Sequence, residues 1–588
     1  MRSTARDCKD RCHNLGLQPQ WGPIKGRKLH TIRRRFNARE LPTSCSRTVK
    51  VNIAKSTRPD HFLPYFPSGY AFTMSEVSTI CFSSINQLAF SWRVARQNCC
   101  KPICYLAVES RAMNFIDMSP EEFCELVERV SRIAGDYLKD LSERAIPAKG
   151  TGAEIEQKFR HTPPEKGDPE EALRGLRDTA LYSRAQNGRF FGYVLGSGEP
   201  AAAIADLLCS VLNQNVTAWR SSPAAVTIEK EVVGWIAQAI GCDQFAGILT
   251  GGGSSANLMG LAMAREAKLA ANECGVRATA PHAVYASTEA HMSISKAVGL
   301  LGIGRENLKL VRVDERFRMI PDALEERMRR DKELGIVPLA VVTTAGTVNT
   351  GALDPFPEIA QVAANHRAWL HVDGSYGALA AIALPGKFAG LAKADSLALD
   401  PHKWLYQPLD CGCLLHRDPQ AARAAFAHSG DYVRPFGQDP IESHVYFEES
   451  IELSRRFRAL KLWFSLRYHG LESFRESIKK DLLHAQRLGS LIERTSELEL
   501  MAPIELTAVC FRYVGDRNST SPELDQINFD ILRRMNERGR VYLSNATLHS
   551  KFCLRACIVN HRTTDSDIDE VVSEVLSAAR EVRTVSPP

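Results

Sequence analysis

Short apolar runs alternate with amphipathic stretches of helical spacing from about residue 245 to residue 416. Such alternation is typical of a mostly parallel β-sheet that helices cover on both faces. The strand-sized runs begin at Gly247, Ala283, Leu308, Leu339, Trp369, Ser396 and Gly412. The pattern therefore predicts an α/β domain with a seven-stranded sheet, in which ligands lie at the carboxyl ends of the strands.

A helix is predicted to begin at Ser119-Pro120-Glu121-Glu122, ahead of the sheet region. The serine supplies an N-cap, the proline suits the first helical position, and Glu122 completes a capping box. Apolar residues follow at helical spacing as far as Leu141, with charged residues between them. We expect a helical N-terminal segment here.

After about residue 450 the pattern changes to two helices, followed by strands that further helices separate. The first helix is predicted over 455–468 and stops near Gly470, and strands are expected around 508–513, 541–544 and 552–559. This mixture is typical of a small α+β domain. The expected organisation is a basic extension over 1–112, a helical N-terminal segment over 113–195, a large ligand-binding domain over 196–450 and a small C-terminal domain over 451–588.

The positive net charge of +6 arises from the N-terminal part of the chain. Residues 1–112 hold 19 Lys and Arg against 6 Asp and Glu, a balance of +13, so residues 113–588 carry −7. A basic arm could bind nucleic acid or an anionic surface, or act as a transit peptide, although its acidic residues weaken the last reading. Because the segment shows little apolar periodicity and no recognisable caps, we expect an unstructured extension without a nucleic-acid partner, and Met113 as a natural start.

The chain has 588 residues, 44% of them hydrophobic, which is enough for a large core and more than one domain. It has no stretch of 18 or more apolar residues, so we expect no membrane-spanning helix and no membrane partner. The cysteines beyond residue 112 are scattered, and Cys411-Gly412-Cys413 lacks the second pair that a structural zinc site needs. We expect reduced thiols, no metal and a cytoplasmic location.

A glycine-rich turn stands between a predicted strand and a predicted helix, in Thr250-Gly251-Gly252-Gly253-Ser254-Ser255-Ala256-Asn257. Glycines let the backbone approach an anion closely, and the start of a helix offers N–H groups and a positive dipole end to a phosphate. By itself such a turn is more often only a turn. It matches neither a P-loop nor a dinucleotide fingerprint, so a nucleoside phosphate is the poorer hypothesis.

Three reactive side chains follow other predicted strands. Asp373 could accept a hydrogen bond from a protonated pyridine nitrogen, although an Asp after a strand is often only a helix N-cap. Lys403 could be a nucleophile if it is partly desolvated, whereas an isolated loop lysine is usually a solvated charge. His291 could stack on a planar ring, although a lone histidine is more often an ordinary polar residue. Together with the glycine turn, they indicate a phosphate-bearing pyridine cofactor.

Six short motifs stand in order along residues 113–588. They are Gly252-Gly253-Ser254, Glu289-Ala290-His291, Ala345-Gly346-Thr347, His371-Val372-Asp373, Asp400-Pro401-His402-Lys403-Trp404 and Arg455-Arg456-Phe457-Arg458-Ala459-Leu460-Lys461. This set resembles the group II pyridoxal-dependent decarboxylases, and most closely their aromatic-L-amino-acid branch. Six ordered matches in one chain are strongly specific.

The resemblance implies a pyridoxal-phosphate enzyme of fold type I that acts as a homodimer, with active sites at the subunit interface. Lys403 would hold the cofactor as a Schiff base. Asp373 would pair with the pyridinium nitrogen, and His291 would stack on the ring. The large domain would then be the one that binds pyridoxal phosphate.

Further site residues follow from the same resemblance. Tyr432 falls where the family has a mobile-loop tyrosine that protonates the intermediate, and Thr347 would lie beside the ring. The remaining contacts to the cofactor or its phosphate would come from Gly253, Ser254, Ser396 and His402.

The implied reaction is decarboxylation of an L-amino acid to an amine and carbon dioxide. Gly374-Ser375 stands where the aromatic decarboxylases usually have two alanines, and Asp400 stands where asparagine is common, so these departures leave the substrate open. Trp404 and residues 455–461 look more like the aromatic branch than the glutamate branch, so we expect an aromatic substrate. The alternatives are an aldehyde synthase, another pyridoxal-dependent lyase, or a non-catalytic α/β protein that binds a phosphorylated ligand at the glycine turn.

Overall fold

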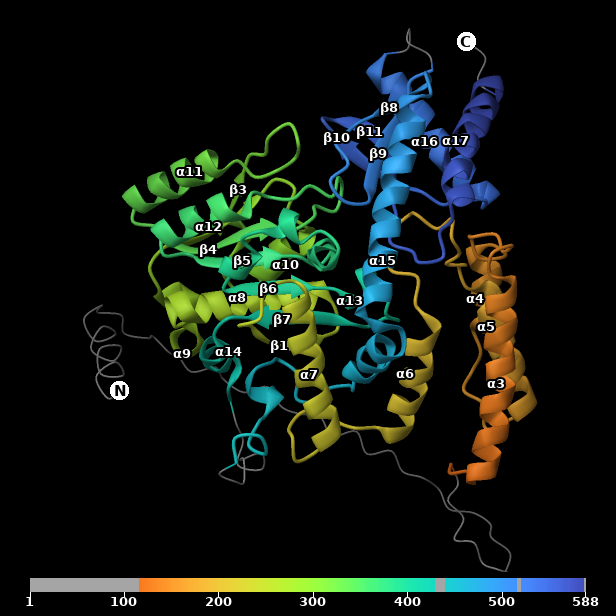
Figure 1. The fold of residues 1–588 in the computed structure, drawn as a ribbon, viewed down its shortest axis with the longest axis horizontal. Coiled ribbons are helices and arrows are strands. Elements are labelled where there is room, and N and C mark those ends of the chain that lie inside the picture. Colours follow the sequence, from red (N-terminus) through yellow and green to blue (C-terminus); the bar gives the residue numbers. More distant parts are fainter. Residues whose placement is uncertain (1–115, 429–438, 516–519, 586–588) are drawn as a thin grey trace, which may run out of the picture. The chain divides into compact units, whose positions relative to one another are not determined.

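The structure is a computed structural model that describes residues 116–428, 439–515 and 520–585. A seven-stranded sheet has the order β1-β7-β6-β5-β4-β2-β3 (Figure 1). Within it, β7 is antiparallel to β1 and β6, and the other pairs are parallel. The strands are β1 (Ala246–Thr250), β2 (His282–Ser287), β3 (Leu308–Val311), β4 (Val337–Thr344), β5 (Trp369–Asp373), β6 (Ser396–Leu399) and β7 (Gly412–His416). The predicted mostly parallel sheet is confirmed.

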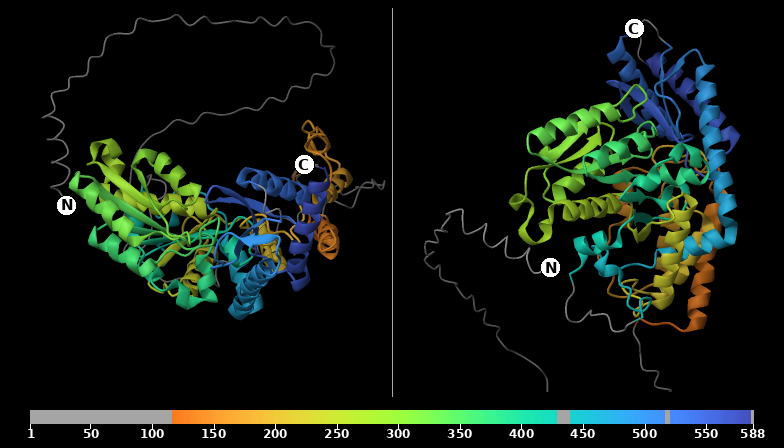
Figure 2. Two further views of the ribbon diagram at one scale, coloured as in Figure 1. Left: turned by 90° about the horizontal axis from the view of Figure 1, so that it is seen from above. Right: turned by 60° about the vertical axis from the view of Figure 1, so that its left-hand side comes forward.

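Helices cover this sheet because its central strands are apolar on both faces. Every residue of β5 and β6 is buried, as expected for strands between two helical layers. α8 (Gly253–Leu269) packs across β4, β5, β6 and β7. The left view of Figure 2 shows helices on both sides of the sheet. The other α-helices of this region are α7 (Pro223–Ala239), α9 (Ala271–Cys274), α10 (Met292–Leu300), α11 (Pro321–Glu333), α12 (Phe356–Asn365), α13 (Pro401–Trp404) and α14 (Pro419–Phe426).

Single turns of 3-10 helix connect these elements. They are η2 (Val276–Ala278), η3 (Arg305–Asn307), η4 (Ala378–Ile382), η5 (Pro385–Phe388), η6 (Leu391–Lys393) and η8 (Tyr446–Glu448). They keep most connections between strands and helices short, so the strand ends stay close to the helices that follow them.

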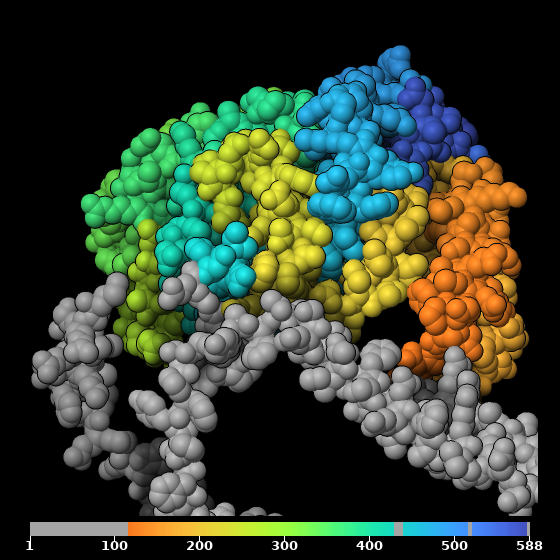
Figure 3. All heavy atoms as spheres, turned by 60° about the horizontal axis from the view of Figure 1, so that its bottom comes forward, coloured from red at the N-terminus to blue at the C-terminus, as the bar shows by residue number. Residues whose placement is uncertain are grey.

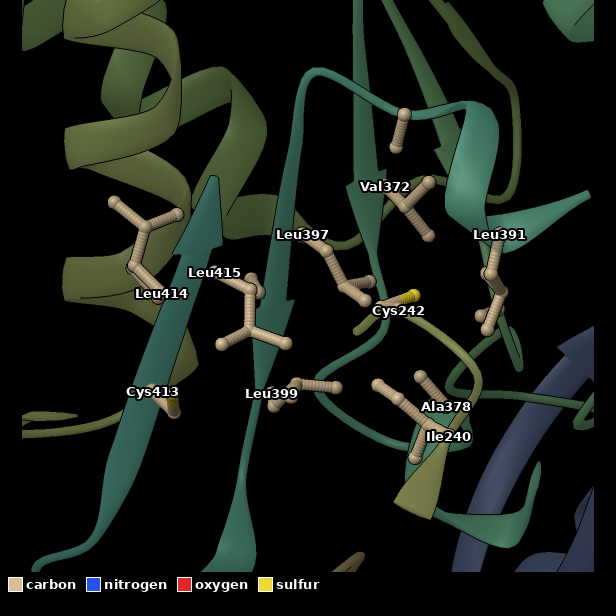
Figure 4. Packing of buried hydrophobic residues seen from close by; sticks show 14 of the residues in the cluster. Ile240, Cys242, Val372, Ala378, Leu391, Leu397, Leu399, Cys413, Leu414 and Leu415 are labelled. Carbon is tan, nitrogen blue, oxygen red and sulfur yellow. The ribbon is translucent and has the colours of Figure 1, made fainter. Parts of the chain in front are cut away.

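Aliphatic side chains of neighbouring strands interdigitate to form the main core. Figure 4 shows Leu397 and Leu399 of β6 between Leu415 of β7 and Val372 of β5, and all four are buried. Full burial of one such side chain stabilises the fold by roughly 1.5–3 kcal/mol. This packing holds the strand ends rigidly, and the strand ends carry the reactive side chains described below.

The N-terminal segment consists of α3 (Pro120–Asp140), α4 (Gly152–Phe159), α5 (Pro169–Tyr182) and α6 (Pro200–Leu212). The predicted capping box is confirmed, because Ser119 Oγ accepts from Glu122 N at 3.1 Å and Glu122 Oε2 accepts from Ser119 N at 2.7 Å. α3 packs against α5, yet it has no buried residue. The apolar stripe that the sequence predicts on α3 is therefore only partly covered by the residues that the structure describes.

The C-terminal region has its own sheet and its own core. The order β10-β11-β9-β8 is antiparallel throughout. α15 breaks at Gly470, whose φ is 76°, which confirms the predicted stop between two helices. The elements are α15 (Ala459–Glu493), β8 (Leu498–Leu500), β9 (Ala508–Tyr513), α16 (Ser521–Arg538), β10 (Ser544–Leu548), β11 (Lys551–Cys557) and α17 (Asp565–Val585).

Two predicted boundaries are wrong, because tertiary contacts override the local pattern. The helix expected from Arg455 begins at Ala459, since the fully buried Arg455 guanidinium donates to Glu229 Oε1 at 2.5 Å and to the carbonyls of Val216 and Leu249. The strand expected over 541–544 lies at Ser544–Leu548, since Tyr542 pairs with Phe190 instead.

In the described part of the chain, no helix combines the length and the apolar character that crossing a membrane requires.

Candidate active site

A cavity of about 290 Å³ opens at the carboxyl ends of the parallel strands. Segments that follow β1, β2, β4, β5 and β6 all reach it, as parallel strand ends do in an α/β sheet. Its lining consists of Gly251, Gly252, Gly253, Ser254, Ser255, His291, Thr344, Gly346, Val348, Asp373, Ser375, Tyr376, Asp400, His402, Lys403 and Leu409. The fold thus brings together side chains that lie up to 158 positions apart in the sequence, from Gly251 to Leu409.

Lys403 lies on α13, the single helical turn that follows β6. Its Nζ is 2.8 Å from Asp400 Oδ2, and its side chain is 16% exposed. The next residue, Trp404, is fully buried and stacks on Tyr376 with ring centroids 6.1 Å apart. This packing anchors the short helix, so the amine is held at the cavity wall beside a carboxylate.

His402 is fixed by the backbone that leads into β7. Its Nδ1 donates to the Cys411 carbonyl at 2.6 Å, which leaves Nε2 3.6 Å from Asp400 Oδ2. Burial lowers the pKa of His402, and the charge of Asp400 opposes that shift. The ring therefore favours its neutral form at neutral pH.

The glycine turn forms the floor of the cavity at the start of α8. Gly252 has a φ of 143°, and a Cβ on Gly253 would lie 2.2 Å from Ser375 Oγ and 2.9 Å from Asp400 Oδ2. Glycine is therefore required at both positions, by conformation at the first and by space at the second. No side chain caps the start of α8, so this helix end is a suitable place for an anion.

Asp373 and His291 complete the set of reactive groups. Asp373 ends β5, is 5% exposed, and accepts from Ser375 N through Oδ1 at 3.2 Å. His291 is the N-cap of α10, and its Nδ1 lies 2.8 Å from Ser293 Oγ. Burial lowers the pKa of His291, while the negative charge of Asp373 works against that effect.

The cavity suits a small ring that carries a phosphate. Ser375 Oγ, Thr344 Oγ1 and Asp400 Oδ1 are buried and have no hydrogen-bond partner among the described residues, whereas buried polar atoms normally have one. A polar ligand would supply these partners. The lysine amine, the strand-end carboxylate and the glycine turn together fit the aldehyde, the ring nitrogen and the phosphate of pyridoxal phosphate.

Asp400 adds a negative charge beside the glycine turn. Its carboxylate lies against the glycine turn as well as against Lys403. A carboxylate repels a phosphate at such distances unless cations compensate. The sequence showed Asp400 only as a departure from the usual asparagine, and its position between amine and glycine turn is visible only in the structure.

Most of the predicted site residues lie together at the cavity. Lys403, His291, Asp373, Gly253, Ser254 and His402 all line it. In the part of the chain described here, no group of three or more His, Cys, Asp or Glu side chains is placed to hold a metal ion. Tyr432 lies outside the described residues.

Thr347 and Ser396 are not among the residues that line the cavity, and their predicted contacts to the cofactor stay predictions. The Thr347 hydroxyl is buried, pairs with Thr350 Oγ1 at 2.8 Å and accepts from Ala352 N at 3.1 Å. Ser396 begins β6, so it lies near the amino end of the strand while the cavity is at the carboxyl end. Both hydroxyls form hydrogen bonds with other residues in the protein interior.

Two cavity features escaped sequence reasoning. Ser375 and Tyr376 line the cavity directly after Asp373, and the polar turn after the strand was a weak signal for them. Arg555 of β11 donates to the carbonyls of Val348 and Gly192, and so connects the C-terminal sheet to the cavity wall. An arginine inside an otherwise apolar strand was the available signal for this contact.

Comparisons with known proteins agree with this geometry. Residues 154–514 match the family described as "Pyridoxal-dependent decarboxylase conserved domain". An aromatic-L-amino-acid decarboxylase of Bacillus atrophaeus is 32% identical over 479 residues, which cover 80% of this chain and 98% of that protein. A 4-hydroxyphenylacetaldehyde synthase of Rhodiola rosea is 31% identical over 409 residues, which cover 68% of this chain and 82% of that protein.

The solved structures give the same picture. The structure of Oryza sativa TDC with PLP and tryptamine has a TM-score of 0.75 and 26% sequence identity, and it covers 79% of this chain and 99% of that chain.

Proposed function

The chain belongs to the pyridoxal-dependent decarboxylase family, and we propose that it converts an aromatic L-amino acid to the corresponding amine and carbon dioxide. The observation that carries the proposal is the convergence of Lys403, Asp373 and His291 on one cavity beside a glycine turn. The aromatic substrate rests on the similarity to the aromatic-L-amino-acid decarboxylase of Bacillus atrophaeus.

Pyridoxal phosphate, when bound, supplies an electron-withdrawing ring that accepts the electron pair released as carbon dioxide leaves. Lys403 would hold the cofactor through its aldehyde, and its amine would exchange with the amine of the substrate. Asp373 would accept a hydrogen bond from the protonated ring nitrogen, and His291 would contact the ring. Gly253, Ser254 and His402 would hold the phosphate.

Loss of carbon dioxide leaves a carbon that must receive a proton. We assign this step to Tyr432, whose phenol O–H can donate a proton by general acid catalysis. The related aldehyde synthase from Rhodiola rosea makes oxidative chemistry the main alternative. His291 and Tyr432 both favour simple decarboxylation, because members with oxidative activity tend to differ at one of these positions.

The proposed enzyme is a homodimer, because the described chain leaves an apolar helical face uncovered. Ile204, Leu207, Leu208 and Val211 of α6 are 66%, 45%, 52% and 55% exposed. Figure 3 shows the face on which α6 and the α3–α5 region reach the surface. Contiguous exposed apolar side chains of this kind mark protein–protein contacts.

The first test is the pair of variants Lys403→Ala and Lys393→Ala, together with an amine-release panel over Phe, Tyr, Trp, Dopa, His and Glu. Lys403→Ala should lose the visible absorbance of the Schiff base and nearly all turnover while remaining folded, because the amine both holds the cofactor and exchanges with substrate. Lys393 is exposed in η6, so its variant should behave as the parent does. Amine release by Lys403→Ala at a rate close to the parent would refute the lysine assignment.

The second test concerns Tyr432→Phe, which removes the phenol and keeps the bulk of the ring. Amine formation should fall by about 10²–10⁴-fold, the usual contribution of general acid catalysis, while KM changes little. Aldehyde, ammonia and hydrogen peroxide should appear instead, because the unprotonated carbanion survives long enough to meet oxygen. Amine and peroxide should be measured in the same reaction. Unchanged amine output without peroxide would remove Tyr432 from the mechanism.

A further inference from the structure

A chain of buried hydrogen bonds runs from the cavity to the amino end of β6. His291 Nδ1 lies 2.8 Å from Ser293 Oγ, and Ser293 Oγ lies 3.0 Å from Asn257 Nδ2. Asn257 Oδ1 then lies 2.8 Å from His371 Nε2, and His371 Nδ1 lies 2.8 Å from Ser396 Oγ. The chain ends at the Trp369 indole, whose Nε1 is 2.8 Å from Ser396 Oγ.

The packing of α8 on the sheet makes this chain possible. Asn257 and Gly260 lie on α8, directly above His371 of β5. A Cβ on Gly260 would lie 2.5 Å from His371 Cε1, so only glycine leaves room for the imidazole. Asn257, Ser293, His371 and Ser396 are each at most 3% exposed, so each polar atom depends on its protein partner.

The Trp369 end of the chain fixes the direction of its hydrogen bonds. An indole N–H can only donate, so Ser396 Oγ accepts from it and directs its own proton to His371 Nδ1. His371 Nε2 must then carry the proton of the neutral ring and donate to Asn257 Oδ1. Burial lowers the pKa of His371 to about 4, which keeps this ring neutral at neutral pH.

The same direction continues to the cavity. Asn257 donates through Nδ2 to Ser293 Oγ, and the Ser293 hydroxyl donates to His291 Nδ1. The backbone N–H of Ser293 also points at His291 Nδ1, at 3.3 Å. Since Nδ1 receives these bonds, the proton of a neutral His291 ring must be on Nε2.

The opposite order of donors and acceptors would leave polar groups of this network without hydrogen-bond partners. It would require a turned Asn257 amide, and Ser396 Oγ would then receive two donors while its own proton lacked an acceptor. At the other end, a proton on His291 Nδ1 would face the backbone N–H of Ser293, so that two donors would point at each other. Amide and tautomer assignments follow the arrangement that satisfies the most hydrogen bonds, and only the forward direction does so.

We propose that Ser293, Asn257 and His371 are positioning residues that hold His291 as the neutral Nε2–H tautomer, so that it offers an N–H donor to the cavity. The assignment of the tautomer is independent of the reaction, whereas its catalytic consequence rests on the proposed function. A neutral imidazole N–H donates hydrogen bonds but is a very weak acid. His291 therefore orients a bound group, and the proton that replaces carbon dioxide comes from elsewhere.

The tautomer can be read from solid-state ¹⁵N NMR of the full chain labelled at histidine, both with and without pyridoxal phosphate. Subtraction of the spectrum of a His291→Asn variant identifies the two nitrogens of His291. In the parent protein, Nδ1 should give the signal of an unprotonated nitrogen and Nε2 that of a protonated one. The opposite pattern in the parent would overturn the proposal without any variant.

Asn257→Asp tests whether the chain of hydrogen bonds determines the tautomer of His291. The carboxylate can only accept, so the Ser293 hydroxyl turns towards it and becomes an acceptor for His291. The Nδ1–H form should then become the major one. Adding Ser293→Ala removes that acceptor and should restore Nε2–H, a rescue that general structural damage would not produce. An unchanged tautomer in folded Asn257→Asp would refute the coupling.

Turnover gives a separate readout of the catalytic consequence. If His291 orients the bound group, kcat should fall by about tenfold or more in Asn257→Asp and recover in the double variant, because a misplaced donor costs roughly the worth of one hydrogen bond to a charged group. If the protein decarboxylated no amino acid, the proposed function would fail while the NMR result remained readable. A switched tautomer with unchanged kcat would refute the orienting role alone.

Discussion

At the scale of single residues, Asp400 places a negative charge between the lysine amine and the glycine turn. It pairs with the Lys403 ammonium at 2.8 Å and lies against the glycine turn. This charge opposes a phosphate on the glycine turn. The repulsion should slow the uptake of the cofactor.

Asp400→Asn should therefore take up pyridoxal phosphate faster than the parent at neutral pH. The substitution keeps the shape and removes the charge that repels the phosphate. Unit charges about 4 Å apart interact by about 1 kcal/mol in bulk water and by more near a protein surface, so a rate increase of about tenfold is expected. Stopped-flow absorbance after mixing cofactor-free protein with pyridoxal phosphate measures the rate.

Asp418→Asn is the matched control for this experiment. Asp418 is exposed and caps α14, and asparagine caps a helix equally well, so uptake should not change. Slower uptake in Asp400→Asn than in the parent would show that the ion pair helps to bind the cofactor.

At the scale of elements, a buried acid links the lysine segment to the C-terminal helices. Asp481 of α15 accepts from the Tyr406 hydroxyl at 2.8 Å and from Asn560 N at 3.1 Å. Tyr406 follows α13, and Asn560 follows β11, so the carboxyl joins three segments. Burial raises the pKa of Asp481 to about 7, against an ordinary value of 3.8.

This shift predicts how stability depends on pH. The folded state holds the Asp481 proton more tightly than the unfolded state, so this contribution is complete below about pH 4 and is lost as the pH rises towards about 7. Asp481→Asn keeps the accepting oxygen and cannot ionise. Relative to the parent, it should become more stable between about pH 5 and about pH 7, by up to about 1.4 kcal/mol per pH unit.

Urea unfolding at several pH values measures this difference. Asp569→Asn is a suitable control, because Asp569 is exposed on α17 beside Arg487 and its pKa is lowered, so it stays ionised across this range. A parallel pH dependence for the parent and Asp481→Asn would show that Asp481 does not titrate in this range.

At the scale of the whole molecule, the exposed face of α6 predicts self-association. Leu208→Glu would place a charge at the centre of this face, and burial of one leucine is worth roughly 1.5–3 kcal/mol. The dimer should therefore dissociate about 10- to 100-fold more readily, as measured by sedimentation velocity over a range of concentrations. Leu334→Glu provides the control, because Leu334 is 75% exposed at the end of α11, and Figure 1 shows α11 far from α6. Equal dissociation of parent and Leu208→Glu would exclude α6 from the interface.

The helices and strands agree with the sequence where hydrophobic periodicity or a capping box marks them. The alternation over the sheet region predicted seven strands, and the capping box at Ser119 predicted the start of α3. Local rules succeed there because hydrophobic period and backbone capping are properties of neighbouring residues. The predicted extension over 1–112 and the domain boundaries stay predictions.

The sequence by itself determined which chemical groups are present, and the tertiary structure decided which of them act together. Lys403, Asp373 and His291 could be chosen from sequence, because each follows an apolar run and parallel strand ends meet at one edge. Ser396 could not be placed, because its role depends on Trp369 and His371 on a neighbouring strand. The position of the Asp400 carboxylate at the cavity depends on contacts between residues that are distant in the sequence. The direction of the hydrogen bonds that lead to His291 depends on such contacts as well, and local patterns do not encode them.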